Sequence, residues 1–273
     1  MAITAADVSK LRKITGAGMM DCKKALEEAN GDFDQAIDII RKKGQAIANK
    51  RADREATEGV VLSKVSEDGK TGAIVVLNCE TDFVAKNENF IALTQSILDE
   101  GLNNASSLDE LKELKLNGTA IKDLVIEQIG IIGEKLDLPY FEVVKAEYVM
   151  AYIHPGNKLA TLVGFNLPVD YQVARDVAMQ IAAMNPVSVD SESVPQDVIE
   201  KELEIGKEQA RIEGKPEAML DKIAQGRLAK FFKESTLLEQ AFVKDNKLTI
   251  REYLKQQNKE LTVTTFRRYT LNN

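Results

Sequence analysis

The sequence predicts an α+β protein: an N-terminal module of three helices, followed by two related subdomains in which helices pack on an antiparallel sheet, the second with an inserted antiparallel helical hairpin. Two observations lead to this prediction. Residues 1 to about 45 have helical periodicity, whereas a β-hairpin pattern followed by an amphipathic helix occurs twice afterwards. A long charged helical segment interrupts the second copy. We expect units at 1–54, 55–140 and 141–273, with the helical hairpin at about 194–235.

The N-terminal module begins with a capping-box pattern, in which Thr4 is followed by Asp7. Glycines in the segment 16–18 break the helical pattern before a second helix. Asp32 can cap a third helix, which we expect to end near Gly44. The size and spacing are similar to those of small ubiquitin-associated modules, which usually act as adaptors.

A basic stretch follows at residues 41–54, where Asp53 is the acidic residue. The simpler interpretation is a solvated linker helix, and the alternative is a docking surface for RNA or an acidic protein. The basic residues of this stretch are Arg41, Lys42, Lys43, Lys50, Arg51 and Arg54.

The first core subdomain starts with a β-hairpin pattern. Two apolar segments, 60–65 and 73–77, flank a polar turn. An amphipathic helix is expected to begin near Asn87, with further helices at about 107–116 and 119–136. The hairpin and the helices together predict a sheet with helices packed on one face.

The second core subdomain repeats this order of elements. Segments 147–153 and 159–166 form another hairpin pattern, and the apolar positions of 173–184 predict the helix that follows it. Thr249 can cap a later helix, and 261–269 reads as a strand that completes the second sheet.

The inserted segment has the pattern of two antiparallel helices. Each helix has only a narrow apolar seam on a charged surface, so the two can bury these seams only against each other. The seam residues are Ile199, Leu203, Gly206 and Ala210 on the outgoing helix, and Leu220, Ala224, Leu228 and Phe231 on the returning one.

Composition and charge exclude several classes of protein. Of the 273 residues, 44% are hydrophobic and 29% are charged, which is typical of a folded globular chain. A formal net charge of -7 disfavours polyanions, so no direct nucleic-acid binding is expected. No apolar run approaches the roughly 20 residues that span a bilayer, and the N-terminus has no export-signal pattern. We therefore expect a cytoplasmic protein that does not bind membranes.

The sequence has no constellation of residues for catalysis. Its cysteines are Cys22 and Cys79 and its histidine is His154, which excludes a disulfide framework, a cysteine-based zinc site and multi-histidine metal sites. Gly16 and Gly18 follow a helix and lack a third glycine, so they do not form a dinucleotide-binding fingerprint. We expect no catalytic residues, cofactor or metal, and hence a protein that is not an enzyme.

Several apolar side chains are candidates for contact with another protein. Met19 and Met20 are adjacent on a helix and cannot both face one core, although spacing alone favours core filling. Phe83 lies between a strand and a helix, where it either folds back on its own sheet or anchors a partner beside Asp82. His154, at the tip of the second hairpin, is either simply solvated or part of a second contact surface.

Three segments resemble those of the bacterial elongation factor Ts family, and the resemblance extends over essentially the whole chain. They are the segment 15–26, TGAGMMDCKKAL, the segment 78–85, NCETDFVA, and the segment 152–160, YIHPGNKLA. In the third segment, Asn157 and Ala160 replace glycines that are common in the family. Because asparagine tolerates left-handed backbone geometry, we expect the loop to keep its shape.

The resemblance implies a guanine-nucleotide exchange factor for elongation factor Tu, the GTPase that delivers aminoacyl-tRNA to the ribosome. It would promote GDP release by disturbing Mg²⁺ and phosphate contacts, without covalent chemistry, and a higher assembly with elongation factor Tu is left open. Asp82 and Phe83 would be wedged against Tu, framed by Thr81 and Val84. The other contact residues implied by the resemblance are Arg12, Met19, Met20 and His154.

A second hypothesis is a non-exchanging adaptor or a ribosome-associated RNA-binding protein, motivated by the basic residues of 41–54. The two hypotheses differ in salt dependence. Binding to phosphates weakens steeply as ionic strength rises, whereas an interface anchored by an aromatic side chain weakens much less.

Overall fold

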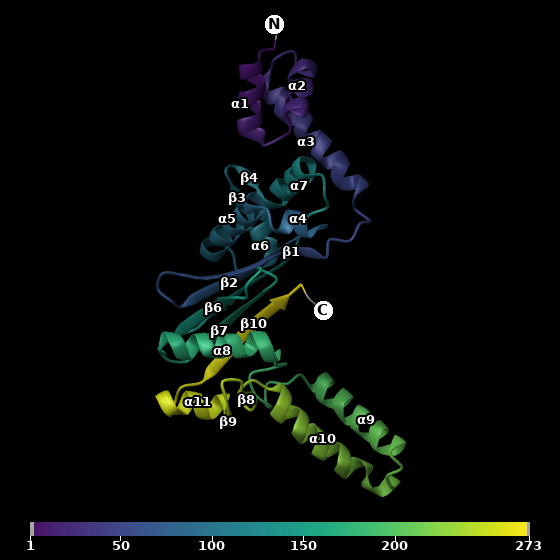
Figure 1. The fold of residues 1–273 in the computed structure, drawn as a ribbon, viewed down its shortest axis with the longest axis vertical. Coiled ribbons are helices and arrows are strands. Elements are labelled where there is room, and N and C mark those ends of the chain that lie inside the picture. The colour runs from purple at the N-terminus through teal and green to yellow at the C-terminus, as the bar shows by residue number, and fades with distance from the viewer. Residues whose placement is uncertain (1–2, 272–273) are drawn as a thin grey trace.

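The structure, a computed structural model, describes residues 3–271. Residues 1–2, which belong to the N-terminal segment expected to have no export-signal pattern, and residues 272–273 lie outside this range. The molecule is elongated, with the N-terminal helices at one end, two sheets in the middle and a projecting helical hairpin at the other end (Figure 1). It is the mixed α and β architecture predicted from the sequence.

The N-terminal module consists of α1 (Ala5–Thr15), α2 (Met19–Glu28) and α3 (Phe33–Lys50). The expected capping box of Thr4 and Asp7 is present at the start of α1. The expected end of the third helix near Gly44 is wrong, because α3 continues to Lys50. Gly44 instead lies where α3 crosses another helix, so its missing side chain serves packing and does not end the helix.

Four of the six basic residues of the stretch at 41–54 pair with acidic residues of the same chain. Arg41 lies 2.7 Å from Glu127, and Lys43 pairs with Asp21. The final part of the stretch contacts Glu80, which is 2.6 Å from Arg51 and 3.1 Å from Arg54. The stretch is therefore more than a solvated linker, since its charges join the module to the core subdomain.

The first sheet is antiparallel with the order β1 (Glu58–Val65), β2 (Thr71–Cys79) and β5 (Asp137–Lys145). The predicted hairpin is confirmed as β1 and β2, whereas β5 was not predicted. The expected boundary between residues 140 and 141 falls inside β5. Helices cover one face of this sheet: α4 (Asp82–Ala85), α5 (Glu88–Asn104), α6 (Leu108–Glu113) and α7 (Ile121–Ile132).

The helices α6 and α7 are shorter than the expected 107–116 and 119–136. A small hairpin of β3 (Lys115–Leu116) and β4 (Thr119–Ala120) separates them, and its turn has positive φ angles at Asn117 and Gly118. At the other end of α7, Gly133 has a φ of 80° and forms a left-handed cap.

The second sheet is antiparallel with the order β10 (Val263–Thr270), β7 (Leu159–Phe165) and β6 (Tyr148–Ile153). This confirms the second hairpin and the prediction that the last strand completes the sheet. The helix α8 (Tyr171–Met184) covers its outer face. The remaining elements on this side are β8 (Ala241–Phe242), β9 (Asp245–Thr249) and α11 (Ile250–Gln257), which starts at the expected Thr249 cap.

The two sheets pack against each other through the faces that carry no helices (Figure 1). Gly72 marks the closest approach, since a Cβ atom there would lie 2.7 Å from Val149 and 2.9 Å from Leu162 of the other sheet. The shared apolar layer contains Val61, Ile74, Val76 and Val144 from the first sheet, and Val149, Ala160 and Leu162 from the second.

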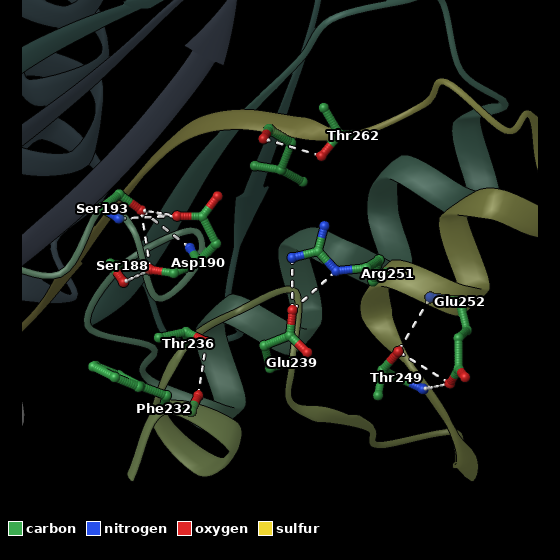
Figure 2. A network of polar contacts seen from close by, with 11 residues as sticks. Ser188, Asp190, Ser193, Phe232, Thr236, Glu239, Thr249, Arg251, Glu252 and Thr262 are labelled. Atoms are coloured by element: carbon green, nitrogen blue, oxygen red, sulfur yellow. Dashed lines mark hydrogen bonds and ion pairs between the residues drawn. The ribbon is translucent and has the colours of Figure 1, made fainter. Parts of the chain in front are cut away.

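The projecting hairpin consists of α9 (Gln196–Ile212) and α10 (Leu220–Ser235), joined through a 3-10 turn at Glu217–Met219. Its antiparallel seam confirms the prediction, and a Cβ atom at Gly206 would lie 3.2 Å from Ala224. Polar contacts fix the base of the hairpin (Figure 2). Ser188 donates a 2.6 Å hydrogen bond to the Asp190 carbonyl, and Arg251 donates to Glu239.

The contact of α3 with α7 leads to the first prediction. A Cβ atom at Gly130 would lie 2.6 Å from the Gly44 Cα atom, so Gly130→Ala must push the two helices apart. We expect the free energy of unfolding, measured in urea, to fall by about 1–3 kcal/mol.

The matched control is Gly226→Ala, at an exposed position of α10 where a Cβ atom would meet nothing within 4 Å. This change should raise stability by about 0.4–1 kcal/mol, because alanine restricts the unfolded chain and favours a helix. Equal effects of the two substitutions would contradict the close packing at Gly130.

The ion pairs of Glu80 lead to a prediction about pH. Burial opposes ionisation of this carboxyl group, but hydrogen bonds from the Lys135 amide, Arg51 and Arg54 outweigh that effect and lower its pKa. The pairs therefore stabilise the fold above the pKa of the unfolded chain and lose this effect as pH falls through the lower pKa of the folded state.

We expect Glu80→Gln to be less stable than the unmodified protein at pH 7 by about 1–2 kcal/mol, since part of the site is screened by solvent. The difference should shrink as pH falls below the pKa of about 4.3 that glutamate has in unfolded chains, and it should be lost once pH falls through the lower pKa of the folded state. Urea unfolding from pH 3 to 7 measures it, with Glu147→Gln, at an exposed pair with Lys70, as the control. A difference that stays constant across this range would refute the electrostatic explanation.

Candidate partner-binding surface

Phe83 projects from the protein instead of folding back onto its sheet. It occupies the first turn of α4, and its side chain is 83% exposed. The same short helix buries Ala85 and partly buries Val84 against the core of the first sheet. Because these residues face inward, the side chain of Phe83 is directed to solvent and is available to another protein.

Asp82 is ionised beside Phe83. Its carboxylate lies 2.6 Å from the Lys86 ammonium group one helical turn later. This hydrogen bond and the charge of Lys86 lower the pKa of Asp82, with a smaller contribution from the charge of Lys158. The α4 turn thus presents an aromatic ring and a carboxylate side by side.

Glu134 holds the base of the α4 turn, and sequence reasoning missed it. Its carboxylate accepts hydrogen bonds from the amides of Glu80, at 3.1 Å, and Thr81, at 3.0 Å. It also accepts one from the Thr81 hydroxyl group, at 2.6 Å. Thr81 in turn caps α4 by accepting a hydrogen bond from the Val84 amide. An isolated glutamate after a helix gave no signal of this role.

Cys79 lies beneath the same turn. Its thiol is buried and donates to the Thr81 carbonyl oxygen at 3.2 Å. Burial and the nearby carboxylate of Glu134 raise the pKa of Cys79 to about 12. The thiol is therefore neutral at physiological pH and contributes packing and a hydrogen bond, not reactivity.

The loop that contains His154 lies next to the start of β1. Asn157 accepts a 2.7 Å hydrogen bond from the Val61 amide through its carbonyl oxygen, and Lys158 lies 2.8 Å from Glu58. Asn157 has a φ of 56°, so the left-handed geometry expected there is present. Since α4 also packs beside β1, the fold brings this loop close to the α4 turn.

His154 itself is exposed, directly after β6, and its ring is hydrogen-bonded to Tyr152 of that strand. Its Nδ1 atom lies 3.0 Å from the Tyr152 hydroxyl oxygen. A small hollow of about 220 Å³, lined mainly by apolar residues of β7 and α8, opens beside these two side chains. The position is compatible with a second contact surface next to α4.

Met19 and Met20 form a separate candidate surface on the N-terminal module, and Arg12 is a further candidate on the same module. The two methionines are 46% and 62% exposed, so the core-filling interpretation favoured by their spacing is wrong. The buried positions of α2 are Cys22, Ala25 and Leu26, which leave the first turn of the helix at the surface. Arg12 is exposed on α1.

Within residues 3–271, no group of histidine, cysteine, aspartate or glutamate side chains is arranged to hold a metal ion. No helix in the same range is long and apolar enough to cross a bilayer.

Comparisons with known proteins identify the family. A family described as Elongation factor TS matches residues 80–273. The relative from Porphyromonas gingivalis strain ATCC 33277, named Elongation factor Ts, is 56% identical over 100% of this chain and 99% of its own. Relatives of the same name are 51% identical in Christiangramia forsetii, over 98% of each chain, and 42% identical in Bacteroides fragilis strain NCTC 9343, over 99% of each. The resemblance seen in the sequence is thereby confirmed, and the chain belongs to the elongation factor Ts family of translation elongation factors.

Proposed function

We propose that this protein is a guanine-nucleotide exchange factor for elongation factor Tu, acting in the cytoplasm during translation elongation. The observation that carries the proposal is Phe83, a large apolar side chain that is 83% exposed on a hydrogen-bonded turn. Exposed aromatic side chains of this kind commonly anchor protein interfaces. Family membership supports elongation factor Tu as the partner.

In the proposed mechanism, Phe83 enters a pocket on elongation factor Tu and Asp82 brings a negative charge beside it, with Thr81 and Val84 framing the two. The intrusion disturbs the contacts of Tu with Mg²⁺ and with the phosphates of GDP. Because divalent cations neutralise much of the phosphate charge, weakening their contacts lowers the affinity for the nucleotide. No bond is made or broken, so the protein acts by binding and not as an enzyme.

Thermodynamic linkage then makes the effect reversible. If this protein weakens GDP binding to Tu by some factor, GDP weakens the binding of this protein by the same factor. A coupling of about 3 kcal/mol already corresponds to roughly 150-fold. Neither ligand holds Tu permanently, and a new nucleotide, including GTP, can displace the exchange factor.

The exposed methionine pair on the N-terminal module would supply a second contact with Tu. Methionine adapts its shape to a partner surface, and Met19 and Met20 stand at the start of α2 next to the glycine at position 18. Arg12 on α1 and His154 beside α4 complete the proposed interface. Contacts on both the module and the core would orient the protein before Phe83 is inserted.

The ion pairs of the basic stretch favour this proposal over RNA binding. Arg51 and Arg54 both contact Glu80, and Arg41 contacts Glu127. These guanidinium groups are engaged with carboxylates, so binding to phosphates would have to break existing pairs. The overall charge of -7 acts in the same direction.

The main test of the proposal is the release of labelled GDP from elongation factor Tu in stopped-flow measurements. The unmodified protein should accelerate release, and Phe83→Ala should reduce the acceleration by about 30-fold or more, as expected for loss of an interface anchor worth at least about 2 kcal/mol. Since Phe83 is largely exposed, the stability of the free protein should change little.

Ile212→Ala is the matched control, because Ile212 is 78% exposed at the distant end of α9. This variant should release GDP at the unmodified rate. Failure of the unmodified protein to accelerate release would refute the proposed function, and full activity of Phe83→Ala would refute the role of the aromatic side chain.

Met19→Ala combined with Met20→Ala tests the second contact. We expect the concentration needed for half-maximal GDP release to rise by about tenfold, with little change in the maximal rate, because the methionines add binding and not the displacement of Mg²⁺. A titration of the release rate with increasing protein measures both quantities. A fall in the maximal rate as large as that of Phe83→Ala would contradict this division of roles.

A further inference from the structure

The geometry points to Glu134 as a positioning residue for nucleotide exchange, one that fixes the α4 turn so that Phe83 is already in place when the partner binds. This inference rests on the function proposed above. The helix α4 contains only 4 residues, which is too short to be stable by itself. Its order must therefore come from contacts with other parts of the chain.

Both oxygen atoms of the Glu134 carboxylate bind the residues that precede α4. One accepts from the amides of Glu80 and Thr81, at 3.1 and 3.0 Å, and the other accepts from the Thr81 hydroxyl at 2.6 Å. Hydrogen bonds to an ionised carboxylate are among the stronger ones in proteins. Since Thr81 is the cap of α4, Glu134 fixes the position from which Asp82 and Phe83 project.

A second carboxylate contact joins the same two segments with donor and acceptor exchanged. The Glu80 carboxylate accepts a 2.5 Å hydrogen bond from the Lys135 amide, while the Glu134 carboxylate accepts from the Glu80 amide. Residues 80–81 and 134–135 are thus joined by reciprocal carboxylate-to-backbone contacts, which we call the carboxylate clamp. In each half of the clamp, a carboxylate accepts hydrogen bonds from backbone amides that lie outside the strands and helices and therefore have no partner within them.

The carboxylate clamp connects the α4 turn to the N-terminal module. Glu134 directly follows Gly133, the cap of α7, and α7 crosses α3 at Gly130 and Gly44. The Lys135 ammonium group donates to the carbonyl oxygen atoms of Ala52 and Arg54, each at 2.7 Å, beyond the end of α3. The two proposed contact surfaces are therefore held in a fixed relation.

A fixed turn matters for exchange because ordering a mobile segment during binding costs free energy. That free energy is then no longer available for the displacement of Mg²⁺. Insertion of Phe83 is the step that displaces Mg²⁺ in the proposed mechanism, whereas first contact uses the methionine surface. Loosening the clamp should thus lower the maximal rate of GDP release more than it raises the concentration for half-maximal release. Lower stability of the fold alone would not produce this division.

The test compares Glu134→Gln with a matched control, Glu110→Gln, in the full-length protein. Glu110 makes the same kind of contact at another turn of the same subdomain, accepting from the Ser106 amide at 2.7 Å and the Ser106 hydroxyl at 2.6 Å. It lies in the first turn of α6, whose cap is Ser107, and takes no part in the α4 turn. Both substitutions remove one carboxylate charge and weaken a local backbone contact.

The first measurement is amide hydrogen exchange of the free protein. In Glu134→Gln, the amides of Glu80 and Thr81 should exchange about tenfold faster, with β2 unchanged, whereas Glu110→Gln should affect only the region of Ser106. Unchanged protection of the Glu80 and Thr81 amides would overturn the clamp itself. This result is independent of whether the protein acts on elongation factor Tu.

The second measurement is GDP release from Tu as a function of protein concentration. Glu134→Gln should lower the maximal rate by about tenfold, as for loss of a charge-assisted hydrogen bond, while the half-maximal concentration changes by less than about threefold. Glu110→Gln should retain both values. A full maximal rate with Glu134→Gln would overturn the positioning role, and no acceleration by the unmodified protein would overturn the proposed function and the role in exchange with it.

Discussion

The packing of the two sheets against each other is the constraint on which the arrangement of the molecule depends. Gly72 permits this packing, because any side chain there would collide with Val149 and Leu162. Stacking the sheets places the β6–β7 loop beside β1, where Lys158 pairs with Glu58 and the Asn157 carbonyl binds the Val61 amide. The loop with His154 and the α4 turn, which are far apart in the sequence, therefore lie in one region of the surface.

The α4 turn combines an apolar side chain in water with a rigid polar support. Exposure of Phe83 gives the free protein none of the stabilisation that burial of a phenylalanine would supply, about 1.5–3 kcal/mol. The α4 turn is stabilised instead by the core contacts of Ala85 and by the hydrogen bonds of Glu134 and Glu80. Surfaces that serve recognition commonly retain such locally unfavourable groups.

Local patterns in the sequence predicted the elements well, and contacts between distant residues account for what was missed. Alternating apolar residues indicated both hairpins, and narrow seams indicated α9 and α10. Strand β5 was missed although it lies in the first sheet, because its ladder with β2 joins segments separated by a whole subdomain of helices. The end of α3 was misplaced because the role of Gly44 is defined by its neighbour in space, Gly130.

The same distinction between local patterns and contacts of distant residues applies to the candidate site. The sequence singled out Phe83, but only the fold decides whether that ring faces its own sheet or solvent, since the answer depends on Ala85 occupying the inward position. Glu134 had no distinguishing pattern, because one carboxylate that binds two amides and a hydroxyl is recognisable only when residues 80–81 lie beside it. The supporting residues of a short helix are tertiary features. Hence the residue proposed to contact a partner can be read from a local motif, whereas the residue proposed to fix its position must be found in the folded chain.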